Sequence, residues 1–328
     1  MFIYIIKRIL WCFPVIFGAI FIVFSIKFID PGDPVAVSLG ASYTQEQYDA
    51  KAKEMGLDQP FWTQFGTYVK KIVTEVDFGT SYVTKRPIAT EIKVRIGTTM
   101  KLAFISIVIA VAAGLPFGII SATKQYSWAD KTVTVASLFF AAMPGFWLAL
   151  MLMLLFALNL RVLPASGLGG WKYWVLPAIS SGTVFIAVIT RMTRSSMLDV
   201  VRQDYMRTAR AKGLKESTVI MKHGVKNALI PIITVIGFQF GMMVAGSIII
   251  ETIFSLPGLG TLMLSAINNR DYPVIQGCVI VLAALVCVIN LIIDLAYGFV
   301  DPRIMEQMKT RSGKSKRVKK RKGEAAAL

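Results

Sequence analysis

The chain has 328 residues, of which 55% are hydrophobic and 17% charged, and its formal net charge is +17. Its mean hydropathy of +0.61 exceeds that of ordinary soluble domains and predicts an integral membrane protein. The single histidine, His223, argues against most metal-dependent and triad-type hydrolase sites. The three cysteines have no spacing typical of a metal site or a disulfide.

Six apolar runs are long enough to cross a membrane as helices. A spanning helix needs about 20 largely apolar residues, because its backbone polar groups must bond within the segment when lipid surrounds it. The first run is longer than a signal-peptide core and no small-residue cleavage site follows it, so we expect it to remain as a span. The six predicted transmembrane helices cover residues 9–29, 98–122, 132–160, 176–196, 232–253 and 274–300.

These runs divide the chain into four parts. Residues 1–29 hold the N-terminus and the first span. Residues 30–95 form an extracytoplasmic segment that we expect to be mostly helical, because Thr44 and Gln47 there have the spacing of a capping box. Residues 96–300 form a core with the other five spans. Residues 301–328 are basic and poor in apolar side chains, so we expect a disordered tail.

The basic residues are concentrated in segments on one side of the predicted spans. Of the 36 lysines and arginines, 9 lie in residues 191–226 and 10 in residues 303–322. This positive-inside bias places both termini in the cytoplasm. It also explains the net charge by membrane topology, so we expect contacts with anionic lipid head groups and none with nucleic acid.

The most informative loop, residues 197–231, follows the fourth predicted span. Asp204 suits a helix N-cap and Gly213 suits the position after a helix, which predicts a helix of about 8 residues between them. A helix this short is unstable by itself. Small side chains at Ala209 and Ala211 would let another protein approach closely, although a helix that merely connects two spans would fit the same pattern.

This loop resembles a known family. Its residues 207–213, RTARAKG, and 227–231, NALIP, are similar to the signature loop of binding-protein-dependent ABC transporter permeases, above all the B-type subunits of dipeptide and oligopeptide permeases. In ABC permeases generally, this motif begins with Glu-Ala-Ala, whereas this chain has Arg207-Thr208-Ala209 at these positions. This difference is typical of the peptide branch of the family. Further similar motifs follow in family order and include PGFWL at 144–148, LPASG at 163–167, ETIFSLPGLG at 251–260 and RDYP at 270–273.

The resemblance implies a type I ABC importer permease fold in a bacterial or archaeal cytoplasmic membrane. It also implies a second permease subunit, two cytoplasmic ATPase subunits and an extracytoplasmic substrate-binding protein as partners. The loop helix would be the coupling helix that docks on an ATPase. Its implied residues are Asp204, Tyr205, Met206, Arg207, Ala209, Arg210, Ala211 and Gly213.

The chain itself has no convincing phosphate-binding loop. Residues 312–315, SGKS, resemble the end of one, but Met308 occupies the position of its first glycine. We therefore expect no enzyme activity, metal or cofactor on this chain, and expect ATP with Mg²⁺ on the partner ATPases.

Two acidic residues in or near the spans are candidates for function. Ionisable side chains inside a membrane are costly, so we expect Asp294 in the sixth predicted span to form an ion pair, with Arg191 or Arg194 as the candidate partner, and a proton relay is the alternative role. Glu251 ends the fifth predicted span on the outer side and is expected to contact the binding protein.

The translocation path is assigned from the resemblance, because the fifth span lines it in this family. On this basis Gln239, Met242 and Met243 are expected to line the path, and Pro144 is expected to bend the third span around it. The residues Gly237 and Gly241 have the spacing of a close-packing motif, so helix packing is a second explanation for this region.

The cargo stays open at this point. Dipeptides or oligopeptides are favoured, and nickel chelates or glutathione-like peptides are alternatives within the family. A secondary transporter is an alternative of another class, but its typical internal repeats and charged midplane sites are not evident. The single histidine argues against a membrane-embedded enzyme.

Overall fold

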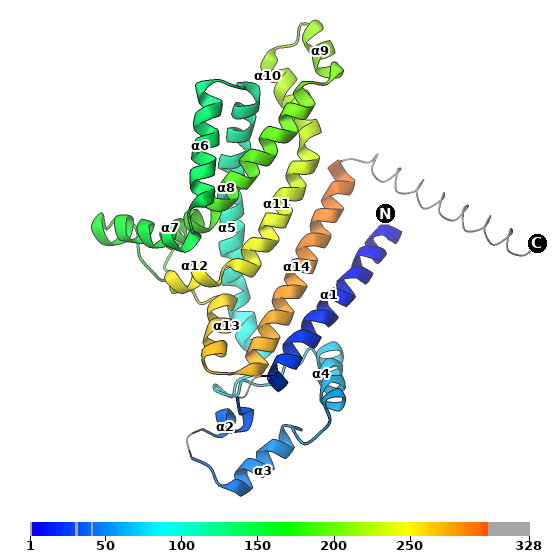
Figure 1. Ribbon diagram of the computed structural model, residues 1–328, viewed down its shortest axis with the longest axis vertical. Coiled ribbons are helices and arrows are strands. Elements are labelled where there is room, and N and C mark those ends of the chain that lie inside the picture. The colour runs from blue at the N-terminus through cyan, green and yellow to red at the C-terminus, as the bar shows by residue number, and fades with distance from the viewer. Residues whose placement is uncertain (1, 30–31, 41, 301–328) are drawn as a thin grey trace, which may run out of the picture.

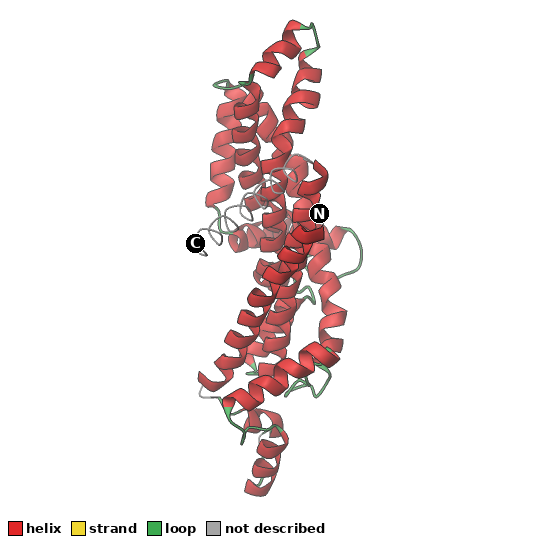
Figure 2. Ribbon diagram, turned by 90° about the vertical axis from the view of Figure 1, so that its right-hand side faces the viewer, coloured by secondary structure: helices red, strands yellow, loops and turns green. Residues whose placement is uncertain are grey.

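The computed structural model describes residues 2–29, 32–40 and 42–300, and side chains within residues 6–295. Over these residues the regular structure is helical, as predicted, apart from one isolated bridge between Thr80 and Pro87 (Figure 2). The basic tail at 301–328 lies outside the described residues, so its predicted disorder stays a prediction.

Five helical stretches are long and apolar enough to cross a membrane, and a bent helix pair raises the number to as many as six. The short elements α10 (Glu216–Thr218) and η2 (Val219–Val225) lead directly into one of them. The five candidate spans contain α1 (Phe2–Ile29), α5 (Ile88–Thr123), α8 (Lys172–Val201), α11 (Lys226–Gly246) and α14 (Tyr272–Val300).

The third predicted span is broken at Pro144. Helix α6 (Trp128–Ala142) and the pair α7 (Gly145–Leu152) and η1 (Met153–Asn159) are bent by 97°. Met143 has an extended backbone, because a following proline disfavours the helical conformation at that position. The expected bend is therefore a complete break, and six spans result only if the bent pair crosses as one.

The fifth predicted span also ends early. Helix α11 stops at Gly246, and α12 (Ile248–Ile253) follows it after one residue. A turn then leads to α13 (Leu259–Asn268), which contacts α5 and α14. Residues 247–268 are thus a separate unit of two short helices beside the bundle.

The segment before α5 is helical, as expected. It contains α2 (Pro34–Leu39), α3 (Gln45–Glu54) and α4 (Phe61–Glu75). The predicted capping box is present, since the Gln47 amide donates to the Thr44 hydroxyl and the Thr44 amide to the Gln47 side chain. Helix α4 packs on α1 through aromatic rings, and the Phe24 and Phe65 centroids lie 5.4 Å apart.

Helices α5 and α8 pack closely along their length because glycines face the seam. A Cβ at Gly118 would lie 2.4 Å from the Thr193 Cβ, and one at Gly182 would lie 2.9 Å from the Ser106 carbonyl oxygen. These distances leave no room for a side chain on either glycine. Since small residues let membrane helices approach to backbone contact, α5 and α8 form one closely packed pair.

The loop between α8 and α11 and the segment before α5 lie at opposite ends of the bundle. In Figure 1, α9 (Asp204–Ala211) and α10 are at the top, whereas α2 and α3 are at the bottom. The unit formed by α12 and α13 lies between the middle of the bundle and its bottom end.

Candidate functional site

The predicted loop helix is present as α9, with bounds close to those expected. Gln203 is its N-cap residue and Asp204 is the first helical residue, and no side chain caps the helix, so the predicted N-cap lies one position too late in the sequence. Asp204 still suits the first turn because an acidic side chain there complements the helix dipole. Gly213 has a φ of 76°, which confirms its predicted place after the helix.

Two residues of α9 anchor it to the rest of the loop. Met206 and Ala209 are both buried and form an apolar cluster with Val219 of η2. A Cβ at Gly224 would lie 3.5 Å from the Met206 methyl carbon, an ordinary van der Waals distance, so Gly224 of η2 lies directly beside the Met206 side chain. Ala209 was expected to face another protein, and the structure corrects this because the side chain packs inside the chain.

The other side of α9 faces solvent. Tyr205 is 43% exposed, and Arg207, Thr208 and Ala211 are exposed as well. We call these four residues the outer face of α9. They are the part of the loop helix that another subunit could touch.

Arg210 stiffens the turn between α9 and α10. Its guanidinium donates from Nη2 to Oε1 of Glu216 at 2.9 Å and from Nε to Oε2 at 3.0 Å. This two-point geometry fixes orientation better than a single contact, although exposure limits its contribution to stability. Arg210 is therefore a brace of the loop and is not on the outer face of α9.

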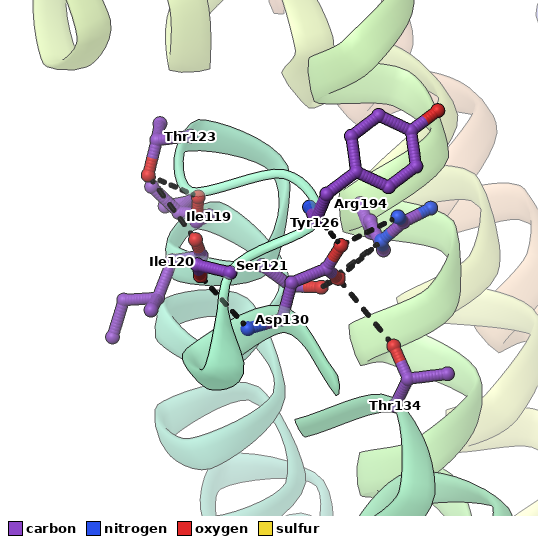
Figure 3. Close-up of polar contacts among 9 residues, drawn as sticks. Ile119, Ile120, Ser121, Thr123, Tyr126, Asp130, Thr134 and Arg194 are labelled. Carbon is purple, nitrogen blue, oxygen red and sulfur yellow. Dashed lines mark hydrogen bonds and ion pairs between the residues drawn. The ribbon is translucent and has the colours of Figure 1, made fainter. Parts of the chain in front are cut away.

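An ion pair between a half-buried arginine and a buried carboxylate holds the inner part of α8, the helix that leads into α9 (Figure 3). The Arg194 guanidinium donates from Nε to Oδ1 of Asp130 at 2.9 Å and from Nη2 to Oδ2 at 3.0 Å. The Ser121 hydroxyl also donates to this carboxylate, and so does the Tyr126 amide at 2.9 Å. These donors offset the cost of burying the charge of Asp130. We call this group the Asp130 clamp.

The clamp ties α8 to the turn between α5 and α6. Ser121 lies near the end of α5, and Asp130 lies in the first turn of α6. The sequence analysis missed Asp130 because the third apolar run was taken to begin two residues later. A local pattern could have revealed Asp130, because Ser127 is an N-cap residue and Asp130 lies three positions after it. The Ser127 hydroxyl accepts from the Asp130 amide at 3.3 Å.

Asp294 has a different partner from the one expected. Its Oδ2 lies 3.0 Å from Nη1 of Arg8 on α1. The predicted pairing with Arg194 is wrong, because Arg194 forms its ion pair with Asp130. The pair of Arg8 and Asp294 instead links α1 to α14, the first and last candidate spans among the described residues.

The residues predicted to line a path do not share one surface. Met242 is 50% exposed, and Pro144 is exposed as well. Gln239 and Met243 are buried inside the chain, which contradicts their place on a path in this conformation. Close packing explains part of this region, because a Cβ at Gly237 would lie 2.3 Å from the Ile293 side chain of α14.

Glu251 does not face an external protein, because its exposed fraction is 0%. Its Oε1 accepts from the hydroxyls of Thr99, at 2.6 Å, and Ser247, at 2.7 Å. Its Oε2 accepts from the Thr261 amide at 3.1 Å. The expected contact with a binding protein is therefore corrected to an internal role.

The fold and this loop define a multi-spanning membrane protein with a short anchored helix, α9, at one end of its bundle. The chain belongs to the family of binding-protein-dependent transport system inner membrane components, whose family model matches residues 114–306. The N-terminal model of the same transport system membrane component matches residues 1–103.

Similar proteins are permeases. The chain is 41% identical to the dipeptide transport system permease protein DppB of Alkalihalophilus pseudofirmus, over 92% of this chain and 98% of the relative. It is 39% identical to the glutathione transport system permease protein GsiC of Escherichia coli strain K12, with the same two coverages. These relatives support the predicted resemblance to ABC permeases of the dipeptide and oligopeptide type.

A solved structure supports the fold. The methionine ABC transporter MetNI in an inward-facing conformation matches with a TM-score of 0.56 at 17% identity, over 64% of this chain and 96% of that one. This likeness confirms the predicted permease fold of ABC importers.

Proposed function

We propose that this chain is one of two permease subunits of an ATP-driven importer, and that α9 is its coupling helix. A second permease subunit would complete the path, two cytoplasmic ATPase subunits would supply ATP hydrolysis with Mg²⁺, and an external binding protein would deliver the cargo. The family membership supports this assignment over a secondary transporter.

The observation that carries the proposal is the two-sided character of α9. Met206 and Ala209 fix the helix to its own loop, while Tyr205, Thr208 and Ala211 stay exposed. A helix anchored on one side and free on the other can transmit a displacement from a partner to the spans on both sides of the loop. Its contacts with η2, and with Val200 and Val201 at the end of α8, give that displacement a route into the bundle.

The topology proposed with this function places α9 in the cytoplasm. The bias of basic residues toward the loop and the tail supports this orientation. Residues 30–95 would then face outward, toward the binding protein, and both termini would be cytoplasmic. The membrane would be the cytoplasmic membrane of a bacterium or archaeon.

Peptides are the cargo that we propose. One relative carries dipeptide transport in its name and another carries glutathione transport, and glutathione is itself a small peptide. Short peptides are thus the class of cargo that includes the substrates named for both relatives. Uptake of labelled dipeptide by the assembled importer, with glutathione as competitor, tests this class of cargo and ranks its two members.

The coupling role is tested by co-purification of the ATPase with a tagged chain. Ala211→Glu places a charge on the outer face of α9 and is expected to reduce the recovered ATPase by about tenfold or more, since buried unpaired charges at interfaces cost several kcal/mol. Ala50→Glu makes the same change on the exposed surface of α3, at the opposite end of the bundle, and should leave recovery unchanged.

Equal recovery with the parent chain and Ala211→Glu would contradict the proposal that this face docks on the ATPase. Ala209 is unsuitable for this test because a charge at a buried position would displace α9 itself.

A further inference from the structure

The carboxylate of Glu251 organises the turn between α12 and α13. Besides the three donors to its carboxylate, its backbone carbonyl accepts from the Leu256 amide at 2.8 Å. Among the described residues no lysine or arginine forms an ion pair with it. Hydrogen-bond donors alone therefore hold this buried carboxylate, and they must stay in place because a buried acceptor without donors is costly.

The turn lies directly against this carboxylate. A Cβ at Gly258 would lie 2.3 Å from the Glu251 carboxyl carbon, and a Cβ at Gly260 would lie 2.8 Å from its Oε2. Only glycine fits at these distances. The carboxylate thus fills the space beneath the turn and fixes the distance between the turn and α12.

Thr99 connects this arrangement to α5. Its buried hydroxyl donates to Glu251 at 2.6 Å and accepts from the Leu259 amide, the first residue of α13, at 2.9 Å. One side chain of α5 therefore holds both the carboxylate and the start of α13. Any rotation of α5 that moves Thr99 must carry the turn with it or break these bonds.

Helix α5 is in turn packed tightly against α8. The two helices are packed at backbone distance along the glycine seam, and the Asp130 clamp joins them near the end that leads to α9. The contacts Asp130–Arg194 and Thr99–Glu251 therefore lie toward opposite ends of one closely packed helix pair. A displacement of α9 has a continuous set of contacts to the turn between α12 and α13.

We propose that Glu251 is a positioning residue that makes the unit of α12 and α13 move together with α5, so that this unit responds to a displacement of α9. The inference rests on the proposed function, because the displacement originates in the coupling helix. In this proposal, hydrogen bonds to the Glu251 carboxylate position the turn, because the described contacts of this carboxylate are hydrogen-bond donors and include no lysine or arginine.

The test uses the assembled importer with its ATPase and binding-protein partners. Thr99→Val removes the hydroxyl at nearly constant volume, and Thr99→Ser retains it. Glu251→Ala removes the carboxylate, and Glu251→Gln retains its shape and an acceptor for the Thr261 amide. Hydrogen exchange of residues 256–262 reports on the turn, and ATPase rates with and without loaded binding protein report on the transmitted motion.

We expect Thr99→Val and Glu251→Ala to speed exchange of the Leu259 and Thr261 amides by about tenfold, the effect of losing one hydrogen bond. Stimulation by the binding protein should fall while the basal ATPase rate and recovery of the ATPase stay unchanged. Thr99→Ser and Glu251→Gln should remain within about threefold of the parent, since each retains the main contacts.

Unchanged stimulation in variants whose turn exchanges faster would overturn the positioning role. Equal losses of basal and stimulated hydrolysis would also overturn it, because they indicate a general structural defect. A parent chain that recovers no ATPase would contradict the proposed function instead. In that case the exchange rates of the purified chain still decide whether Thr99 and Glu251 hold the turn.

Discussion

Buried carboxylates of this chain join segments that are distant in the sequence. Asp130 accepts from α5 and α8, Glu251 accepts from α5, and Asp271 accepts from the Tyr82 amide at 3.0 Å. Burial of a carboxylate is unfavourable by several kcal/mol unless donors replace water. Each of these residues therefore fixes the relative position of two segments. Removal of one of these carboxylates is expected to destabilise the contact between the two segments that it joins.

The Asp130 clamp is expected to contribute to the stability of the protein. Asp130→Asn removes the charge that faces Arg194 and is expected to lower the free energy of unfolding by about 2–4 kcal/mol, because the arginine keeps only part of its exposure to water. Asp199→Asn removes an exposed carboxylate from the same region of α8 and should change stability by less than about 0.5 kcal/mol.

Thermal unfolding in detergent measures both variants. The double variant Asp130→Asn with Arg194→Gln should be less destabilised than the sum of the single changes, because each change removes the partner of the other. Additive losses would show that the two side chains stabilise the protein independently, contrary to the clamp.

At the scale of elements, the pair of α5 and α8 depends on its glycines. Gly118→Ala places a Cβ against Thr193 and is expected to destabilise the protein by about 1–3 kcal/mol through overpacking. Gly97→Ala makes the same change in the same helix where no atom lies within 4 Å, so it should be neutral or stabilising by up to about 1 kcal/mol.

The difference between these two alanine variants in unfolding temperature tests the seam. If Gly118→Ala is as stable as Gly97→Ala, α5 and α8 separate without penalty, and a displacement of α8 need not reach α5.

The loop helix α9 shows why an element has to be judged with its surroundings. A helix of 8 residues is too short for stability by itself, so it persists here because Met206 and Ala209 are buried against η2. The positions that give the helix its anchor cannot also serve as its docking surface.

For the whole molecule, the separation of α9 from α3 predicts a labelling pattern. In a chain whose native cysteines are replaced, Ala50→Cys should react with a membrane-impermeant maleimide added to intact cells. Ser217→Cys of α10 should react only after the membrane is opened, since basic loops remain in the cytoplasm. Labelling in the opposite order would reverse the proposed topology.

Local sequence patterns were sufficient to predict several features of the fold. Apolar run length predicted the spanning helices, Thr44 and Gln47 predicted a capping box, and Gly213 predicted the end of α9. The quoted motifs also indicated the permease family, which the comparisons show. Such signals act within one or two helical turns, or within a contiguous run of apolar residues, so they can be detected without knowledge of the fold.

The pairing of side chains from different helices could not be read from local patterns and became clear from the folded chain. It paired Arg194 with Asp130 and Arg8 with Asp294, and it buried Glu251 beneath a turn. It also turned the expected bend at Pro144 into a break. Partners across helices depend on which helices pack, at what height and in which rotation, and these are set by long-range packing of the whole bundle.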